Sequence, residues 1–265
     1  MLFRSVGALT VGKATPYLVH AIHSASVNAV TLVASSGAML AGALVALLYR
    51  DGPHEFPRRP FSLRLAGSVI RHRETRLAIA GYLGHMWELY AMWTWLPAFL
   101  AASAAARAAR GLPAPPPALT DFLAFGAIAA GGLGCVWGGW AARSAGYERV
   151  VTRSMAASGA CSLGVGLLFG ASPWLLVPVA WVWGFFVVAD SAQFSALVTE
   201  VAPPHAVGTA LMLQTTLGFL LTMATIQMVP AIAVACGWRW AFPVLALGPA
   251  LGIAAIRRLG RNAQV

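Results

Sequence analysis

Long apolar runs recur along the whole chain, and they restrict its fold more than any other feature. We expect them at residues 5–21, 27–49, 77–102, 119–142, 150–171, 174–201, 207–233 and 240–256. A membrane-spanning helix needs about 20 apolar residues. Because 59% of the 265 residues are hydrophobic and only 10% are charged, the chain could not surround such a core with a polar surface. The sequence therefore predicts an all-α polytopic membrane protein with about eight transmembrane helices.

The basic residues lie mainly between the runs and predict the orientation of the chain. With eight spans, most of the 18 Lys and Arg residues fall on the same side of the membrane. Basic loops stay in the cytoplasm. We therefore expect a multi-pass protein of the cell's inner (plasma) membrane with both termini cytoplasmic. The net charge of +10 is then explained by loops that face the lipid bilayer, which we expect as the partner of the chain. We expect no nucleic acid as a partner.

The polar segment 50–76 is the longest interruption and divides the chain. Residues 1–49 would hold two helices, 50–76 a basic cytoplasmic linker, and 77–265 a bundle of six helices. Pro53, Pro57 and Pro60 keep the first half of the linker from being helical. Residues 62–76 fit either an amphipathic helix on anionic headgroups or a solvated basic linker, and the sequence leaves both open.

Two motifs in the second part of the chain carry a family resemblance. Gly237, Trp238 and Arg239 precede the last run, and a glycine-rich segment at 138–149 follows the run 119–142. Both resemble motifs of major facilitator superfamily (MFS) transporters, the first before helix twelve and the second between helices eight and nine. The resemblance implies that the second segment is a gating loop motif, comprising Gly139, Arg143, Gly146 and Arg149. Arg143 stands where the family has the Asp that holds its cytoplasmic gate.

Two helices followed by six resemble an MFS chain that begins at its fifth helix. On this interpretation the chain is N-terminally truncated, with the last two helices of the N-terminal bundle and an MFS-like C-terminal six-helix bundle. The substrate of such transporters lies between two six-helix halves. A complete cavity would therefore need a partner chain or a dimer.

Few ionisable or amide side chains lie inside the apolar runs. Each charge at mid-bilayer costs about 2.5–3.5 kcal/mol, so each requires a reason. His85 and Glu88 share a helical face in the third run, and Asp190 and Gln193 share one in the sixth. Gln214 in the seventh run and Lys13 in the first are two further candidates.

The resemblance implies that the third and sixth runs correspond to helices seven and ten, which line the family's cavity. A poorly solvated carboxylate can take and release a proton near neutral pH. We therefore expect Glu88 or Asp190 to carry a coupling proton, with His85 as its hydrogen-bonding neighbour. The residues expected to contact an unidentified small-molecule substrate are Gln193, Gln214, Lys13, Trp87, Tyr90 and Trp93. Each has a structural alternative, such as an intrahelical Glu88–His85 pair, a helix-bridging Asp190 or simple aromatic packing.

These features predict a secondary active transporter, driven by protons. A non-transporting membrane remnant or scaffold from a shortened gene is the main alternative. An intramembrane enzyme is a minor one, since His85 is not part of a His-Glu-x-x-His motif and neither Ser191 nor Ser195 lies in a Gly-x-Ser-x-Gly motif. We therefore expect no catalytic residue, no metal and no cofactor.

Overall fold

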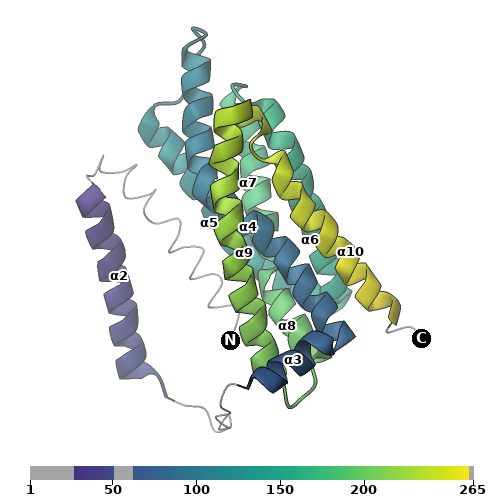
Figure 1. Ribbon diagram of the computed structural model, residues 1–265. Coiled ribbons are helices and arrows are strands. Elements are labelled where there is room, and N and C mark those ends of the chain that lie inside the picture. Colours follow the sequence, from purple (N-terminus) through teal and green to yellow (C-terminus); the bar gives the residue numbers. More distant parts are fainter. Residues whose placement is uncertain (1–26, 51–61, 263–265) are drawn as a thin grey trace.

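The structure, a computed structural model, describes residues 27–50 and 62–262, which form helices without any strand among them (Figure 1). Six helical segments are long and apolar enough to cross a membrane, which confirms the all-α class and is compatible with a multi-pass membrane protein. They are Thr31–Leu48, Arg73–Ala108, Pro117–Ala145, Pro173–Val201, Val207–Cys236 and Trp238–Gly260.

The helices follow one another with short connections. Pro117 begins α5, where a missing N–H costs nothing, and Gly146 ends it with φ +82°, a conformation that favours glycine. The α-helices are α2 (Val27–Leu48), α3 (Leu63–Arg71), α4 (Arg73–Ala108), α5 (Pro117–Ala145), α6 (Tyr147–Gly164), α7 (Pro173–Ala189), α8 (Ser191–Val201), α9 (Val207–Cys236) and α10 (Leu247–Asn262). Three short 3-10 helices are η1 (Val165–Leu168), η2 (Trp238–Trp240) and η3 (Pro243–Ala246).

Of the eight spans that the sequence predicts, six correspond to apolar segments among the described residues. The first expected run, 5–21 with Lys13, lies outside the described residues, as do residues 51–61 of the expected linker. The run 150–171 forms α6 and η1 but is not among the six apolar segments. Glu148, Arg149 and Arg153 in its first two turns, together with several serines, make α6 too polar.

Residues 62–76, for which the sequence left two alternatives, are helical and include α3 and the first turn of α4. Ser62 caps α3, its hydroxyl accepting a hydrogen bond from the Leu65 N–H at 3.4 Å. Ala66 and Val69 are buried where α3 packs against α4 and α9, whereas Arg64 is exposed. The amphipathic helix thus lies across one end of the protein with its apolar face on neighbouring helices (Figure 1).

Helices α4 to α10, called the bundle below, pack in a regular pattern. α4 packs against α9 and α10, α7 packs against α5 and α6, and α6 also contacts α10. Glycines permit the closest approaches: a side chain at Gly134 of α5 would meet the Phe185 carbonyl of α7, and one at Gly84 of α4 would meet Gly248 of α10. Small residues at four-residue spacing therefore set these two interfaces.

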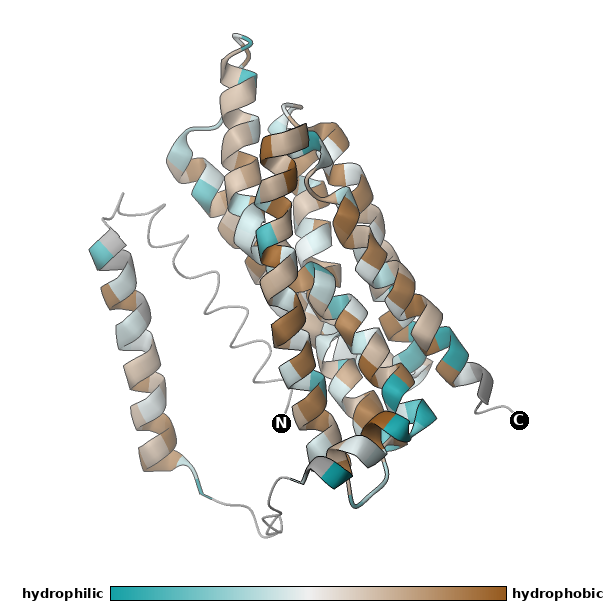
Figure 2. Ribbon diagram, viewed as in Figure 1, coloured by the Kyte–Doolittle hydropathy of each residue, from teal (hydrophilic) through white to brown (hydrophobic). Residues whose placement is uncertain are grey.

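The outer surface of the bundle suits a lipid environment. Large apolar side chains are exposed on several helices, including Trp140 of α5, Trp174 of α7 and Met223 of α9. Hydrophilic residues gather at the end that carries α3 and the last turns of α10 (Figure 2). The bundle thus has apolar sides and a polar end, as a membrane-embedded protein requires.

A buried polar site between α4, α6, α7 and α8

A break between α7 and α8 provides one side of the site. α7 ends at Ala189 and α8 begins at Ser191, with Asp190 between them at φ −93° and ψ −11°. The Asp190 carbonyl accepts hydrogen bonds from the N–H groups of Gln193 and Phe194. The predicted span 174–201 corresponds to one apolar segment, Pro173–Val201, and nothing in the sequence signals the irregularity at Asp190 inside it.

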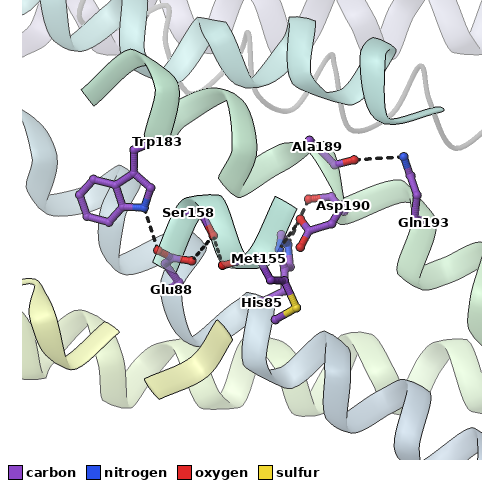
Figure 3. Close-up of polar contacts among 9 residues, drawn as sticks. His85, Glu88, Met155, Ser158, Trp183, Ala189, Asp190 and Gln193 are labelled. Atoms are coloured by element: carbon purple, nitrogen blue, oxygen red, sulfur yellow. Dashed lines mark hydrogen bonds and ion pairs between the residues drawn. The ribbon is translucent and has the colours of Figure 1, made fainter. Parts of the chain in front are cut away.

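Glu88 of α4 connects three helices inside the bundle (Figure 3). Its side chain is 1% exposed. Trp183 Nε1 of α7 donates to Glu88 Oε1 at 2.8 Å, and Ser158 Oγ of α6 donates to Oε2 at 2.7 Å. The Ser158 hydroxyl also lies 3.3 Å from the Met155 carbonyl, to which it can donate when Glu88 is protonated and donates to Ser158. The site can therefore hold Glu88 in either protonation state.

His85 of α4 faces the break between α7 and α8, rather than Glu88. Its Nδ1 is 3.0 Å from Asp190 Oδ1, within ion-pair distance but without hydrogen-bond alignment, and its Nε2 is 3.0 Å from Ser191 Oγ. Both His85 and Asp190 are buried. Of the two carboxylates expected beside His85, Asp190 is the one that lies there, and Glu88 belongs to a separate network. Ser191 can donate to or accept from the imidazole, so this pair too tolerates a change of protonation.

The two glutamines lie close to this region with part of their hydrogen-bonding capacity unused. Gln193 Nε2 donates to the Ala189 carbonyl at 3.0 Å (Figure 3), and Gln214 Nε2 of α9 donates to Ser195 Oγ at 3.4 Å. Both amide oxygens are buried and have no hydrogen-bond partner among the described residues. They are acceptors that an incoming polar group could use.

The three aromatic residues of α4 occupy different surroundings. Trp87 Nε1 donates to the Val244 carbonyl at 3.1 Å, which attaches α4 to the segment before α10. Tyr90 and Trp93 contact each other, and Tyr90 also contacts Phe219 of α9. The buried Trp93 Nε1 has no hydrogen-bond partner within the described part of the chain. The indole N–H of Trp87 is thus already bonded, whereas that of Trp93 has no partner among the described residues.

The expected gating loop leads from α5 to the polar end of the bundle, and its glycine-rich start at Gly138 lies against the Ala189 carbonyl and Gln193. Gly139 is buried in α5, Arg143 is exposed near its end, and Arg149 is exposed in the first turn of α6. Gly146 separates the two helices, and its N–H donates to the Ala142 carbonyl at 3.0 Å. Its positive φ explains the glycine in physical terms.

Three partners in the site were not predicted from the sequence: Ser158, Trp183 and Ser191. A signal existed for Ser158, because Ser154, Ser158 and Ser162 recur every four residues and are all buried on one side of α6. Trp183 gave no comparable signal, since it lies among many other apolar residues of α7.

The two donors to Glu88 provide a test of the site. We expect Ser158→Ala to lower the free energy of unfolding by about 1 kcal/mol and Trp183→Phe by about 1–2 kcal/mol, as for other interhelical hydrogen bonds in membranes. Ser144→Ala is the control, because Ser144 is exposed and bonds only within α5; a change within about 0.5 kcal/mol is expected. Equilibrium unfolding of the purified protein in detergent gives the three values. Equal values for all three would contradict the observed network.

Comparisons with known proteins do not assign the site. No protein-family model matches the chain, and no curated protein matches it significantly. Within the described residues, no group of three or more His, Cys, Asp or Glu side chains is arranged to hold a metal ion. The site itself offers two buried carboxylates, an imidazole and two amides.

Proposed function

We propose that this chain is a proton-coupled secondary transporter of a small molecule, with an MFS-like arrangement, and that Glu88 and the His85–Asp190 pair bind the coupled protons. The observation that carries this proposal is that both buried carboxylates face groups able to serve two protonation states. A purely structural carboxylate needs partners for one state only. In an apolar bundle, ionisable residues are costly and typically serve transport.

The packing order of the bundle supports this proposal. The bundle can be divided into two halves, in which α4 corresponds to α7–α8, α5 to α9 and α6 to α10. α4 contacts α9 and α10 of the other half, and α7 contacts the corresponding helices α5 and α6. α4 and α7 also begin at opposite ends of the bundle (Figure 1). This is the pattern of an inverted repeat, which many secondary transporters have.

The break at Asp190 is a second support. Discontinuous helices are common at the ion and substrate sites of transporters, because the broken backbone frees polar groups inside the membrane. Gln193 lies just after the break, Trp93 on α4 and Gln214 on α9. Each has a buried polar atom without a hydrogen-bond partner among the described residues. We therefore assign these three residues, together with Tyr90, to substrate contact.

The proposed transporter needs a second bundle to close its cavity. We propose that a partner chain or a second copy supplies it, and that the protein lies in the inner membrane with its arginine-rich end in the cytoplasm. This orientation follows the positive-inside rule. α2 is compatible with such contacts, because its described side chains are exposed rather than packed on the bundle.

Transport can be tested without knowing the substrate. Vesicles containing the full chain are given a pH gradient and a defined mixture of metabolites, and their contents are measured by mass spectrometry. We expect at least one compound to accumulate only with the gradient. Asp190→Asn should lower that accumulation at least about tenfold, as expected for loss of a group used in catalysis of proton transfer, whereas Glu200→Gln, on the exposed side of α8, should not.

Each outcome of this experiment has a defined meaning. If no compound accumulates although the chain is present in the membrane, the transporter proposal fails and the non-transporting scaffold is favoured. If accumulation persists in Asp190→Asn, Asp190 is excluded as a proton-binding group. Equal losses in Asp190→Asn and Glu200→Gln would indicate a general charge effect.

A further inference from the structure

A cavity of about 370 Å³ lies where the start of α6 meets the last turns of α10. Its lining residues are Glu148, Arg149, Thr152, Arg153, Ile256 and Arg257. The three arginines are exposed, and none makes a hydrogen bond or ion pair with another described residue. Three guanidinium groups with free donors thus converge on one cavity at the polar end of the bundle.

The carboxylate in this cavity does not neutralise the arginines. Glu148 is half-buried and packs against the backbone of α10 at Gly260, where a side chain would not fit beside it. Burial raises the pKa of its carboxyl group. The cavity therefore keeps an excess of positive charge.

An apolar stripe of small side chains continues from the arginines along both helices. On α6, Arg149 and Arg153 are followed on the same exposed side by Ala156, Ala160 and Leu163. On α10, the residues that precede Arg257 at helical spacing are Ala254 and Ala250, both exposed. The two helices touch at this level, where Gly159 faces Pro249. The surface is thus cationic at the polar end of the bundle and apolar along the rest of its length.

We propose that this surface binds an anionic phospholipid, with the phosphodiester held by Arg149, Arg153 and Arg257. The acyl chains lie over the alanines of α6 and α10. Arginine forks bind phosphate oxygens through paired hydrogen bonds, and basic pockets between transmembrane helices accept anionic headgroups. A soluble phosphate would use the arginines alone, whereas the adjoining apolar stripe fits only a ligand with a tail. This site is separate from the proposed proton-binding groups.

The test compares lipids that share acyl chains but differ in headgroup charge. Purified full-length protein in detergent is titrated with phosphatidylglycerol or phosphatidylcholine, and bound lipid is counted by native mass spectrometry. We expect Arg153→Gln with Arg257→Gln to weaken phosphatidylglycerol binding at least fivefold. The matched control is Arg71→Gln with Arg73→Gln, two exposed arginines at the same end of the bundle, and less than a twofold change is expected.

A second variant tests the apolar half of the site. Ala156→Phe changes an exposed position and fills the stripe, so it should weaken phosphatidylglycerol binding while leaving the arginines intact. Equal losses in the two arginine pairs would overturn the proposal in favour of diffuse surface charge. Equal binding of phosphatidylcholine would do the same. Displacement by glycerol 3-phosphate at matched concentration, or no effect of Ala156→Phe, would indicate a soluble anion instead.

Discussion

Glu88→Gln is expected to leave the bundle folded and to abolish gradient-driven accumulation, whereas Glu88→Ala is expected to destabilise the protein by about 3–5 kcal/mol. Glutamine can accept from Trp183 Nε1 through its carbonyl and donate to Ser158 Oγ through its amide, with Ser158 then donating to the Met155 carbonyl. It cannot release a proton. Alanine leaves a cavity and a buried indole N–H without an acceptor.

Two measurements on the same preparations separate these effects. Equilibrium unfolding in detergent reports the structural role, and accumulation in vesicles with a pH gradient reports the proposed proton-binding role. Full accumulation by a folded Glu88→Gln protein would leave Glu88 as a helix-bridging residue only. Comparable destabilisation by glutamine and alanine would mean that the hydrogen bonds require an ionised carboxylate.

Gly134→Ala is expected to lower the free energy of unfolding by about 3 kcal/mol or more. A Cβ at this position would overlap the Phe185 carbonyl oxygen of α7. That oxygen belongs to a helix backbone and cannot rotate away as a side chain would. The methyl group therefore forces α5 and α7 apart along their whole interface, which includes the contact of Gly138 with the Ala189 carbonyl beside the break.

Gly132→Ala is the matched control for this prediction. Gly132 lies in the same helix, and a Cβ there would meet no atom within 4 Å. Alanine is the better helix former, so the control should be unchanged or stabilised by up to about 1 kcal/mol. Thermal unfolding of the two variants in the same detergent provides the comparison. Similar midpoints for Gly134→Ala and Gly132→Ala would show that α5 and α7 do not pack as described.

The sequence was sufficient to predict the helical membrane class, because hydrophobic run length reports directly on spanning helices. Glycines four residues apart are typical of close helix interfaces, and Gly134/Gly138 and Gly248/Gly252 do lie at two of them. The pair Gly166/Gly170 has the same spacing but does not: Gly166 faces the Arg239 carbonyl, and Gly170 occupies a turn at φ +72°. Spacing alone does not distinguish a helix interface from a helix end.

The partners of the buried acids could not be predicted. Ser158 and Trp183 lie 70 and 95 residues from Glu88, and which of them it meets depends on the rotation of α6 and α7 about their axes. The sequence left open whether His85, one turn from Glu88, lies beside that residue or beside Asp190. The packing of α4 against α7 and α8 places it beside Asp190, whose Oδ1 is 3.0 Å from His85 Nδ1.

The polar character of α6 has a consequence for how the chain enters the membrane. A segment with Glu148, Arg149, Arg153 and three buried serines has little affinity for lipid by itself and would be poorly recognised by the insertion machinery. Its neighbours α7 and α10 are both synthesised after it. The place of α6 inside the bundle therefore depends largely on contacts with helices that follow it in the chain.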